Sequence, residues 1–274
     1  MGSVRAVAGV ARQGEGGWKT SQQSLGITTG AQSKRPARSG VARVVSLAFS
    51  RSSDRSYPKE HLLNRRAKAT ATMPSYKLTY FNITGLGEPL RFLLHYAGID
   101  FEDFRVEFED WPALKSKMPM EQIPILEIDG RVYHQTRAIS RYLAKKGNLY
   151  GSNELEALEI DMCVDDIEDC RLYYSAHFRE QEPARKAKLL ELAIEKTPWY
   201  LAKFEQRVKK NGGYFVAGKL SWADTHFSAI IELISNIAQK EFVKDFPALD
   251  KLDQTVRSTP KIKAYLDKRP HTKF

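Results

Sequence analysis

Residues 121–136 constrain the fold of this chain more than any other stretch, because they run E-Q-I-P-I-L-E-I-D-G-R-V-Y-H-Q-T. The Asp-Gly pair at 129–130 between two apolar runs predicts a tight β-hairpin. Pro124 opens the first strand. Because it has no N–H, it fits a tight turn, and the peptide bond before it can be cis. The second strand runs into Gln135 and Thr136, where we expect a helix whose first N–H groups, with the Thr136 hydroxyl, suit a carboxylate. The stretch therefore predicts a cradle for a small peptide or an anion on a rigid hairpin.

Strands and helices alternate on both sides of this hairpin. Gly98 is expected to close a helix, and Asp110 to cap a short helical turn that has Pro112 in its first turn. The expected elements are strands at 76–81 and 101–108, the hairpin at 124–134, and helices at 88–97 and 136–146. The order β-α-β-α-β-β-α, a right-handed crossover followed by a hairpin and a helix, predicts a thioredoxin-like α/β domain at 73–152.

Beyond a linker at 147–153 the pattern is helical throughout. Ser-Trp-Ala-Asp at 221–224 predicts a capping box at the start of an apolar helix that ends near 237. The other expected helices are at 155–178, 183–210, 247–258 and 260–268. We therefore predict an all-α domain at 153–274.

The positive net charge lies in residues 1–72, which contain 13 Lys/Arg and 3 Asp/Glu. The remainder contains 30 basic and 30 acidic residues, so its charge does not favour nucleic acid as a partner. We expect residues 1–72 to be a disordered basic extension. Their Arg-rich, acid-poor composition suits a mitochondrial transit peptide, while a dispensable extension and upstream sequence read from an incorrect start stay open.

The remaining composition excludes two classes. No apolar run approaches the length of a membrane span. Cys163 and Cys170 cannot form a disulfide framework and fit ordinary packing in a reducing compartment.

Several motifs resemble those of the cytosolic glutathione S-transferases, and of their sigma class in particular, along residues 73–274. The motifs are Y-K-L-T-Y-F at 76–81, D-W-P at 110–112, Q-I-P at 122–124, H-Q-T at 134–136, S-W-A-D at 221–224 and K-R-P-H-T at 268–272. The resemblance implies a homodimer that binds glutathione on the α/β domain and a hydrophobic electrophile against the helical domain. It also implies a cytoplasmic location, with a mitochondrial one as the alternative if residues 1–72 direct import.

Tyr80 is, by this resemblance, the catalytic tyrosine. The thiol of glutathione has to be ionised to attack, and at a pKa of about 8.5 only a few per cent is thiolate at neutral pH. A tyrosine hydroxyl suits the task of stabilising the anion, because its own pKa near 10 keeps it a hydrogen-bond donor. A tyrosine merely packed in the core is the alternative, and we assign that role to Tyr76.

The resemblance implies a set of glutathione contacts in addition to Tyr80. The residue before a cis-proline pairs with the cysteinyl backbone, and a Gln-Ser pair, here Gln-Thr, holds the γ-glutamyl end. Further residues wall the site, contact the glycyl carboxylate, or reach the amine of glutathione across the dimer interface. The implied residues are Trp111, Lys115, Gln122, Ile123, Pro124, Gln135, Thr136 and Asp169.

Other positions follow the resemblance less closely. Members of the class such as the vertebrate prostaglandin D synthase have an arginine in the turn after the tyrosine, where this chain has Leu86. A backbone N–H is the expected substitute for the support that this arginine gives to the thiolate. In the prostaglandin-forming branch three acids bind Mg²⁺ or Ca²⁺ near the dimer axis, and the matching residues are Asp165, Glu168 and Asp169. The expected lining of the electrophile pocket is Phe81, Arg171, Tyr174 and Phe274.

Glutathione conjugation of hydrophobic electrophiles, including lipid peroxidation products, is therefore the predicted function. A glutathione-dependent prostaglandin D isomerase needs the same thiolate and is one alternative. A non-catalytic structural protein resembling the lens crystallins is the other.

Overall fold

A four-stranded sheet organises the first part of the computed structural model, which describes residues 73–272. The strand order is β2-β1-β3-β4, in which β1 pairs in parallel with β2 and antiparallel with β3. The strands are β1 (Tyr76–Phe81), β2 (Glu102–Val106), β3 (Ile125–Ile128) and β4 (Arg131–His134). The β-α-β-α-β-β-α order is the predicted thioredoxin-like order, so this part of the fold prediction is confirmed.

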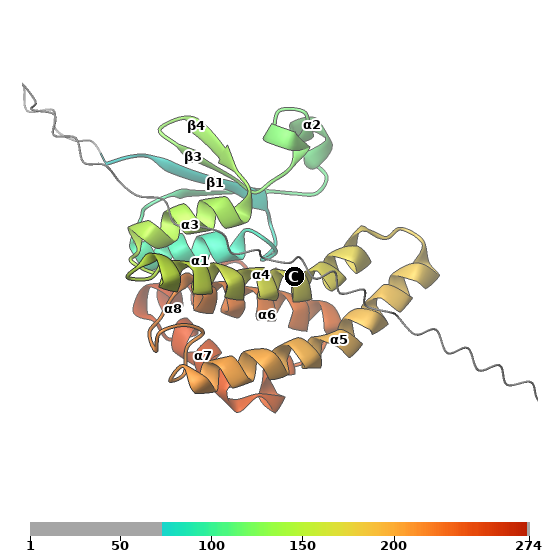
Figure 1. Cartoon of the computed structure of the whole chain (residues 1–274). Coiled ribbons are helices and arrows are strands. Elements are labelled where there is room, and N and C mark those ends of the chain that lie inside the picture. Colours follow the sequence, from blue (N-terminus) through green and yellow to red (C-terminus); the bar gives the residue numbers. More distant parts are fainter. Residues whose placement is uncertain (1–72, 273–274) are drawn as a thin grey trace, which may run out of the picture. The chain divides into compact units, whose positions relative to one another are not determined.

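The first part also contains three helices. They are α1 (Glu88–Ala97), α2 (Trp111–Lys115) and α3 (Thr136–Lys146), with a 3₁₀ turn at Pro119–Glu121. Helices α1 and α3 lie together below the sheet, between it and the helical part (Figure 1). Gly98 closes α1 in the left-handed conformation, as expected. Asp110 precedes α2 but its side chain makes no capping hydrogen bond, so that detail of the prediction is wrong.

Helices alone form the second part. They are α4 (Glu154–Arg179), α5 (Pro183–Lys210), α6 (Trp222–Ala238), α7 (Pro247–Arg257) and α8 (Pro260–Leu266), with a 3₁₀ turn at Phe242–Asp245. Helix α6 is buried over most of its length, and its buried residues include polar side chains such as Asp224 and His226 beside the apolar ones. The predicted capping box is present: Ser221 Oγ and N–H both bond to the Asp224 carboxylate, which also accepts from the Phe215 N–H.

One buried carboxylate joins the two parts. Glu88, at the start of α1, is 1 % exposed and accepts hydrogen bonds from Arg91 and from the Tyr265 hydroxyl. Arg269 also pairs with Glu88 and extends the network to Glu232 on α6. Since a buried charge is stable only when it is paired, this network fixes α1, and the turn before it, to the end of the chain.

Cys163 and Cys170 are free and buried within α4, as the composition predicted. No helix among residues 73–272 is long and apolar enough to cross a membrane. The proposed disorder and targeting of residues 1–72, and the pocket contact of Phe274, lie outside the described residues. The exact boundary between the two domains, at 152–153, stays a prediction.

Candidate functional site

The turn at residues 82–87, here called the tyrosine turn, supports the hydroxyl of Tyr80. Tyr80 lies near the end of β1 and is 6 % exposed. The backbone N–H of Leu86 donates a hydrogen bond of 2.9 Å to the Tyr80 oxygen. The hydroxyl proton therefore points elsewhere, and it has no acceptor within residues 73–272. This leaves Tyr80 able to donate to a ligand.

Two glycines of the tyrosine turn allow the approach. A Cβ at Gly85 would lie 2.5 Å from the Tyr80 oxygen, and one at Gly87 would lie 2.5 Å from Cδ1 of the ring. Gly85 also has φ +44°, in the left-handed region that favours glycine. Any side chain at either position would displace the tyrosine or the turn.

Burial keeps the Tyr80 hydroxyl protonated. Burial raises the pKa of Tyr80 above its ordinary value, whereas the Leu86 N–H and the positive charges of Arg91 and Arg171 oppose that rise. A phenol that stays neutral at physiological pH is a donor, which is the form that thiolate stabilisation requires.

The predicted peptide cradle lies on the segment that leads into β3, the strand that pairs antiparallel with β1. The Ile123–Pro124 peptide bond is cis, Pro124 is buried, and the paired register of β3 begins only at Ile125. Ile123 thus lies just before β3, outside the paired register.

Gln135 and Thr136 open helix α3. Gln135 is exposed and has φ 76°, a conformation that is uncommon for a residue other than glycine and that often marks functional positions. Thr136 is the first residue of the helix and is 8 % exposed. The positive end of an 11-residue helix lies here, which favours a carboxylate.

Helix α2 carries Trp111 and Lys115, two of the predicted glutathione contacts. The half-buried Trp111 ring lies 5.3 Å from the Phe81 ring, edge to face, so it adjoins the residue that follows Tyr80. Lys115 is exposed, and its Nζ lies 3.6 Å from the Glu121 carboxylate, so binding another carboxylate would reorganise this surface pair. Gln122 is exposed on the segment that leads to the cis-proline.

The predicted residues of α4 separate into two groups. Glu168 is buried, accepts from Arg171 and lies 2.9 Å from Nε2 of His226 on α6. Burial opposes ionisation of Glu168, but the contacts with His226 and Arg171 lower its pKa to about 2. Asp169, the next residue and about 100° further round the helix, is exposed.

The same contacts bear on the metal and pocket predictions. Asp165 pairs with Arg137 and Glu168 pairs with Arg171, so two of the three acids already have guanidinium partners. No group of three metal-ligating side chains among residues 73–272 is arranged to hold an ion, and the Mg²⁺ or Ca²⁺ prediction is not supported. Tyr174 is 1 % exposed, with its hydroxyl 2.7 Å from Thr197 Oγ1 on α5, so we leave it out of the pocket.

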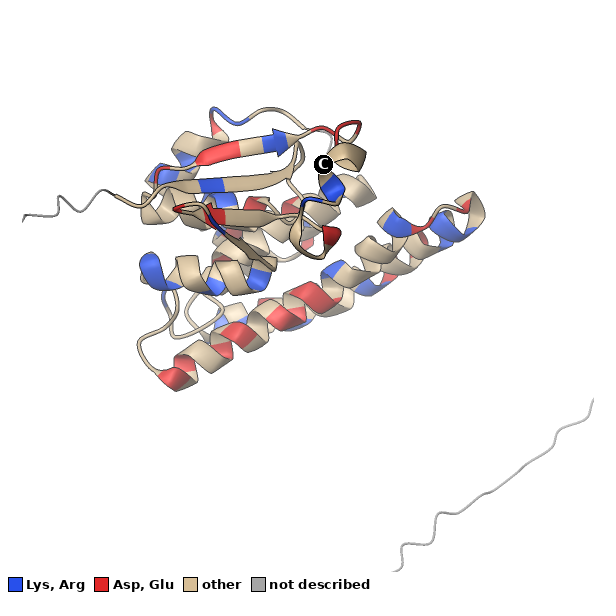
Figure 2. Cartoon of the chain, turned by 90° about the horizontal axis from the view of Figure 1, so that it is seen from above, with Lys and Arg blue, Asp and Glu red and all other residues tan. Residues whose placement is uncertain are grey.

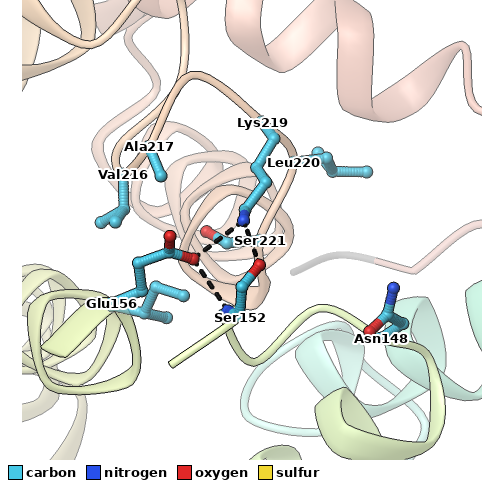
Figure 3. A pocket seen from close by; sticks show the side chains of 10 residues that line it. Asn148, Ser152, Glu156, Val216, Ala217, Lys219, Leu220 and Ser221 are labelled. Carbon is cyan, nitrogen blue, oxygen red and sulfur yellow. Dashed lines mark hydrogen bonds and ion pairs between the residues drawn. The ribbon is translucent and has the colours of Figure 1, made fainter. Parts of the chain in front are cut away.

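A separate cavity of about 80 Å³ lies between the 148–152 linker and the loop before α6. The Lys219 ammonium bridges Glu156 and Ser152 across it (Figure 3). Its volume holds a few water molecules and not a tripeptide, so we assign it no ligand.

Comparison with known proteins places these features in a family. The family models described as glutathione S-transferase N-terminal and C-terminal domains match residues 76–145 and 168–269. A glutathione S-transferase of Anopheles gambiae is 42 % identical over 201 residues, covering 73 % of this chain and 99 % of that protein. The human hematopoietic prostaglandin D synthase is 32 % identical, covering 74 % of this chain and 100 % of that protein.

A solved structure agrees with these sequence matches. The structure described as prostaglandin synthase D of Nilaparvata lugens superposes with a TM-score of 0.70 at 46 % identity. It covers 72 % of this chain and 100 % of that one. The matched length corresponds to the part of the chain that carries both the sheet and the helices.

Proposed function

The chain belongs to the glutathione S-transferase family, and from this membership we propose that Tyr80 donates a hydrogen bond to the thiolate of bound glutathione. The thiolate then attacks a hydrophobic electrophile. This conjugation is the reaction after which the related glutathione S-transferases are named. The hydrogen bond from the Leu86 N–H to the Tyr80 oxygen carries the residue assignment. It fixes the hydroxyl and leaves its proton for the ligand.

The energy required is within reach of this arrangement. Lowering a thiol pKa by about two units takes about 2.7 kcal/mol of preferential stabilisation of the anion. Hydrogen bonds to charged groups contribute about 1.5–3 kcal/mol each. We infer that the Leu86 N–H compensates in part for the thiolate support of the missing arginine, because a phenol that accepts a hydrogen bond becomes a stronger donor to the thiolate.

We assign the rest of glutathione to the hairpin and α2. The backbone of Ile123, before Pro124, pairs with the cysteinyl residue in the manner of an added strand. Gln135 and Thr136 hold the γ-glutamyl carboxylate at the start of α3. The remaining contacts are those of Trp111, Lys115 and Gln122.

A homodimer of the sigma class is the assembly we propose. Exposed residues of α4 recur at alternating spacings of three and four, which places them on one face. They are Leu155, Leu158, Met162, Asp165, Asp169 and Leu172. Figure 2 shows how acidic residues repeat along this long helix. An apolar stripe that carries Asp169 supports a partner subunit covering it, with Asp169 reaching the glutathione of that partner.

Sedimentation at several protein concentrations tests the dimer. Met162→Glu should shift the protein to the monomer, whereas Leu192→Glu, which is also exposed but lies on α5, should not. A monomeric wild type would contradict the assembly without touching the assignment of Tyr80.

The prostaglandin isomerase alternative rests on the similarity to two proteins that carry that name. It uses the same thiolate, so a product profile across lipid aldehydes, hydroperoxides and prostaglandin H separates it from conjugation. Glutathione binding without turnover of any of these would favour the crystallin-like alternative.

Tyr80→Phe is the direct test of the mechanism. Loss of one positioned donor should lower kcat/KM for conjugation by about 100-fold, with glutathione affinity nearly unchanged. Tyr76→Phe is the matched control, because the Tyr76 hydroxyl lies 3.1 Å from that of Tyr142, away from the tyrosine turn. Unchanged turnover in Tyr80→Phe, or an equal loss in both variants, would refute the assignment.

We also propose the cytoplasm as the location of the protein. A fluorescent reporter fused to residues 1–72 should remain diffuse in the cytosol. Import into mitochondria would instead establish the alternative.

A further inference from the structure

Three aromatic rings form a continuous surface beside Tyr80. Phe81 ends β1, Phe108 follows β2 and Trp111 begins α2. The Phe81 and Phe108 rings stack with centroids 4.7 Å apart and planes inclined by 19°. The Trp111 ring meets the Phe81 ring edge to face with centroids 5.3 Å apart, and the Tyr80 ring centroid lies 5.7 Å from that of Phe81. We call Phe81, Phe108 and Trp111 the aromatic wall.

Phe108 distinguishes the aromatic wall from ordinary core packing. It is 47 % exposed although it stacks on a neighbouring ring, and it is followed by two exposed acidic residues, Glu109 and Asp110. Single exposed apolar side chains are normal, but a stacked group next to a reactive centre is not explained by packing alone. Its open ring face retains apolar area that a ligand could remove from water.

The order of the rings gives the wall a direction. From the Tyr80 ring, whose hydroxyl the proposed function places at the thiolate, successive ring contacts lead through Phe81 to the exposed Phe108. An electrophile attacked at that thiolate would extend its substituent along this path. Flat conjugated groups stack on aromatic faces and edges at such separations, whereas compact groups gain little from them.

We propose that the aromatic wall seats the planar, conjugated part of the electrophile, and that Phe108 determines the preference for such electrophiles over compact ones. This inference rests on the proposed function, because it takes the thiolate to lie at Tyr80. The sequence motifs identified Phe81 as pocket lining and Trp111 as a glutathione contact. Phe108 was not identified, since it falls at an expected strand end.

The chemistry of the test uses two α,β-unsaturated ketones that differ by one ring. In methyl vinyl ketone and in 4-phenyl-3-buten-2-one the thiolate sulfur forms a bond to the β carbon. The electron pair of the double bond moves onto the ketone as an enolate, and the α carbon then takes a proton from solvent. No group leaves, so the phenyl ring is the difference that the wall can sense.

Phe108→Leu keeps the position apolar and removes its flat face. It should raise KM for the phenyl ketone about threefold to tenfold and change kcat/KM for methyl vinyl ketone less than about twofold. Phe104→Leu is the matched control, because Phe104 is 40 % exposed on β2 and lies under Lys77 rather than against Phe81. It should change neither substrate.

An equal loss for both ketones, or no loss for either, would overturn the role of Phe108. Calorimetric binding of the two finished glutathione conjugates gives a readout that does not need turnover. Phe108→Leu should weaken only the phenyl-bearing conjugate. If wild-type protein turns over neither ketone, the proposed function fails. The binding difference between the two conjugates then still decides whether the wall exists.

Discussion

The tyrosine turn and helix α4 hold their functional groups by different means. In the tyrosine turn the support comes from the backbone: one N–H reaches the Tyr80 hydroxyl, and two glycines make room for the ring. On α4 the support comes from other side chains, since Arg171 and His226 fix Glu168. A site supported by the backbone is vulnerable to one added methyl group, whereas a side-chain network is vulnerable to the loss of a partner and to pH.

The largest effect is expected where the two regions are joined. Glu88→Ala leaves the buried Arg91 and the half-buried Arg269 without their shared carboxylate. Breaking a buried pair in this way should lower the free energy of unfolding by about 3–5 kcal/mol in denaturant titrations. Glu102→Ala, which removes an exposed pair with Lys77 at 3.0 Å, should cost less than about 1 kcal/mol. Similar losses in both variants would mean that the junction is not what fixes α1.

The next effect separates backbone support from side-chain support. Gly87→Ala places a methyl group against Cδ1 of Tyr80 and should lower kcat/KM about 100-fold, because small misplacements of a catalytic group have effects of that size. Gly147→Ala is the control, since Gly147 also has an ordinary negative φ and its new Cβ would come no closer than 3.3 Å to Tyr96. Circular dichroism should show both variants folded. Full activity in Gly87→Ala would show that the tyrosine turn tolerates displacement.

Two buried carboxylates of the helical part should respond to pH in opposite directions. The pKa of Glu168 is lowered from 4.5 to about 2, so its contribution to stability is present above about pH 4.5 and is lost as the pH falls toward 2. Burial raises the pKa of Asp224 from 3.8 to about 6, so its contribution is present below about pH 3.8 and is lost as the pH rises through 6.

Unfolding free energies measured from pH 3.5 to pH 7 check both signs. Relative to Glu168→Gln, the wild type should gain about 1–2 kcal/mol as the pH rises within this range. Relative to Asp224→Asn, it should lose about 2–3 kcal/mol over the same range. The variants cancel the titration of all other groups, so parallel slopes for the two comparisons would contradict the assignment.

The smallest effect is expected from divalent cations. Because Asp165 pairs with Arg137 and Glu168 with Arg171, titration with Mg²⁺ should release no heat of binding and should leave activity unchanged. Arg137→Leu removes the partner of Asp165, so this variant tests whether Arg137 is what keeps a cation from Asp165. A saturable heat in the wild type would show that the cation displaces Arg137.

Local sequence patterns predicted the short-range features of the fold well. The Asp-Gly hairpin, the cis-proline and the capping box at Ser221 all depend on residues adjacent in sequence, and each is present. The Leu86 N–H donates to the Tyr80 oxygen, and whether a backbone N–H also replaces the missing arginine at the thiolate stays a prediction. These features follow from short-range geometry, which a sequence states directly.

Contacts between distant segments could not be predicted in the same way. Tyr174 was expected in a pocket and instead packs against α5, because helix placement decides which side of α4 faces a neighbour. The Glu168–His226 contact joins residues 58 apart, and Glu88 meets Tyr265 across 177 positions. Nothing in the sequence near Glu88 indicates that its carboxylate binds the end of the chain.

Burial of the two cysteines of α4 affects how readily the electrophilic substrates can alkylate the protein itself. Electrophiles that alkylate glutathione also alkylate protein thiolates, and the chain has two cysteines, which are 1 % and 3 % exposed. Burial raises the pKa of Cys163 to about 11 and that of Cys170 to about 12. At neutral pH only about one thiol in ten thousand or fewer is then ionised. We therefore expect the two thiols to react slowly with the electrophilic substrates, so that alkylation at these positions does not inactivate the enzyme.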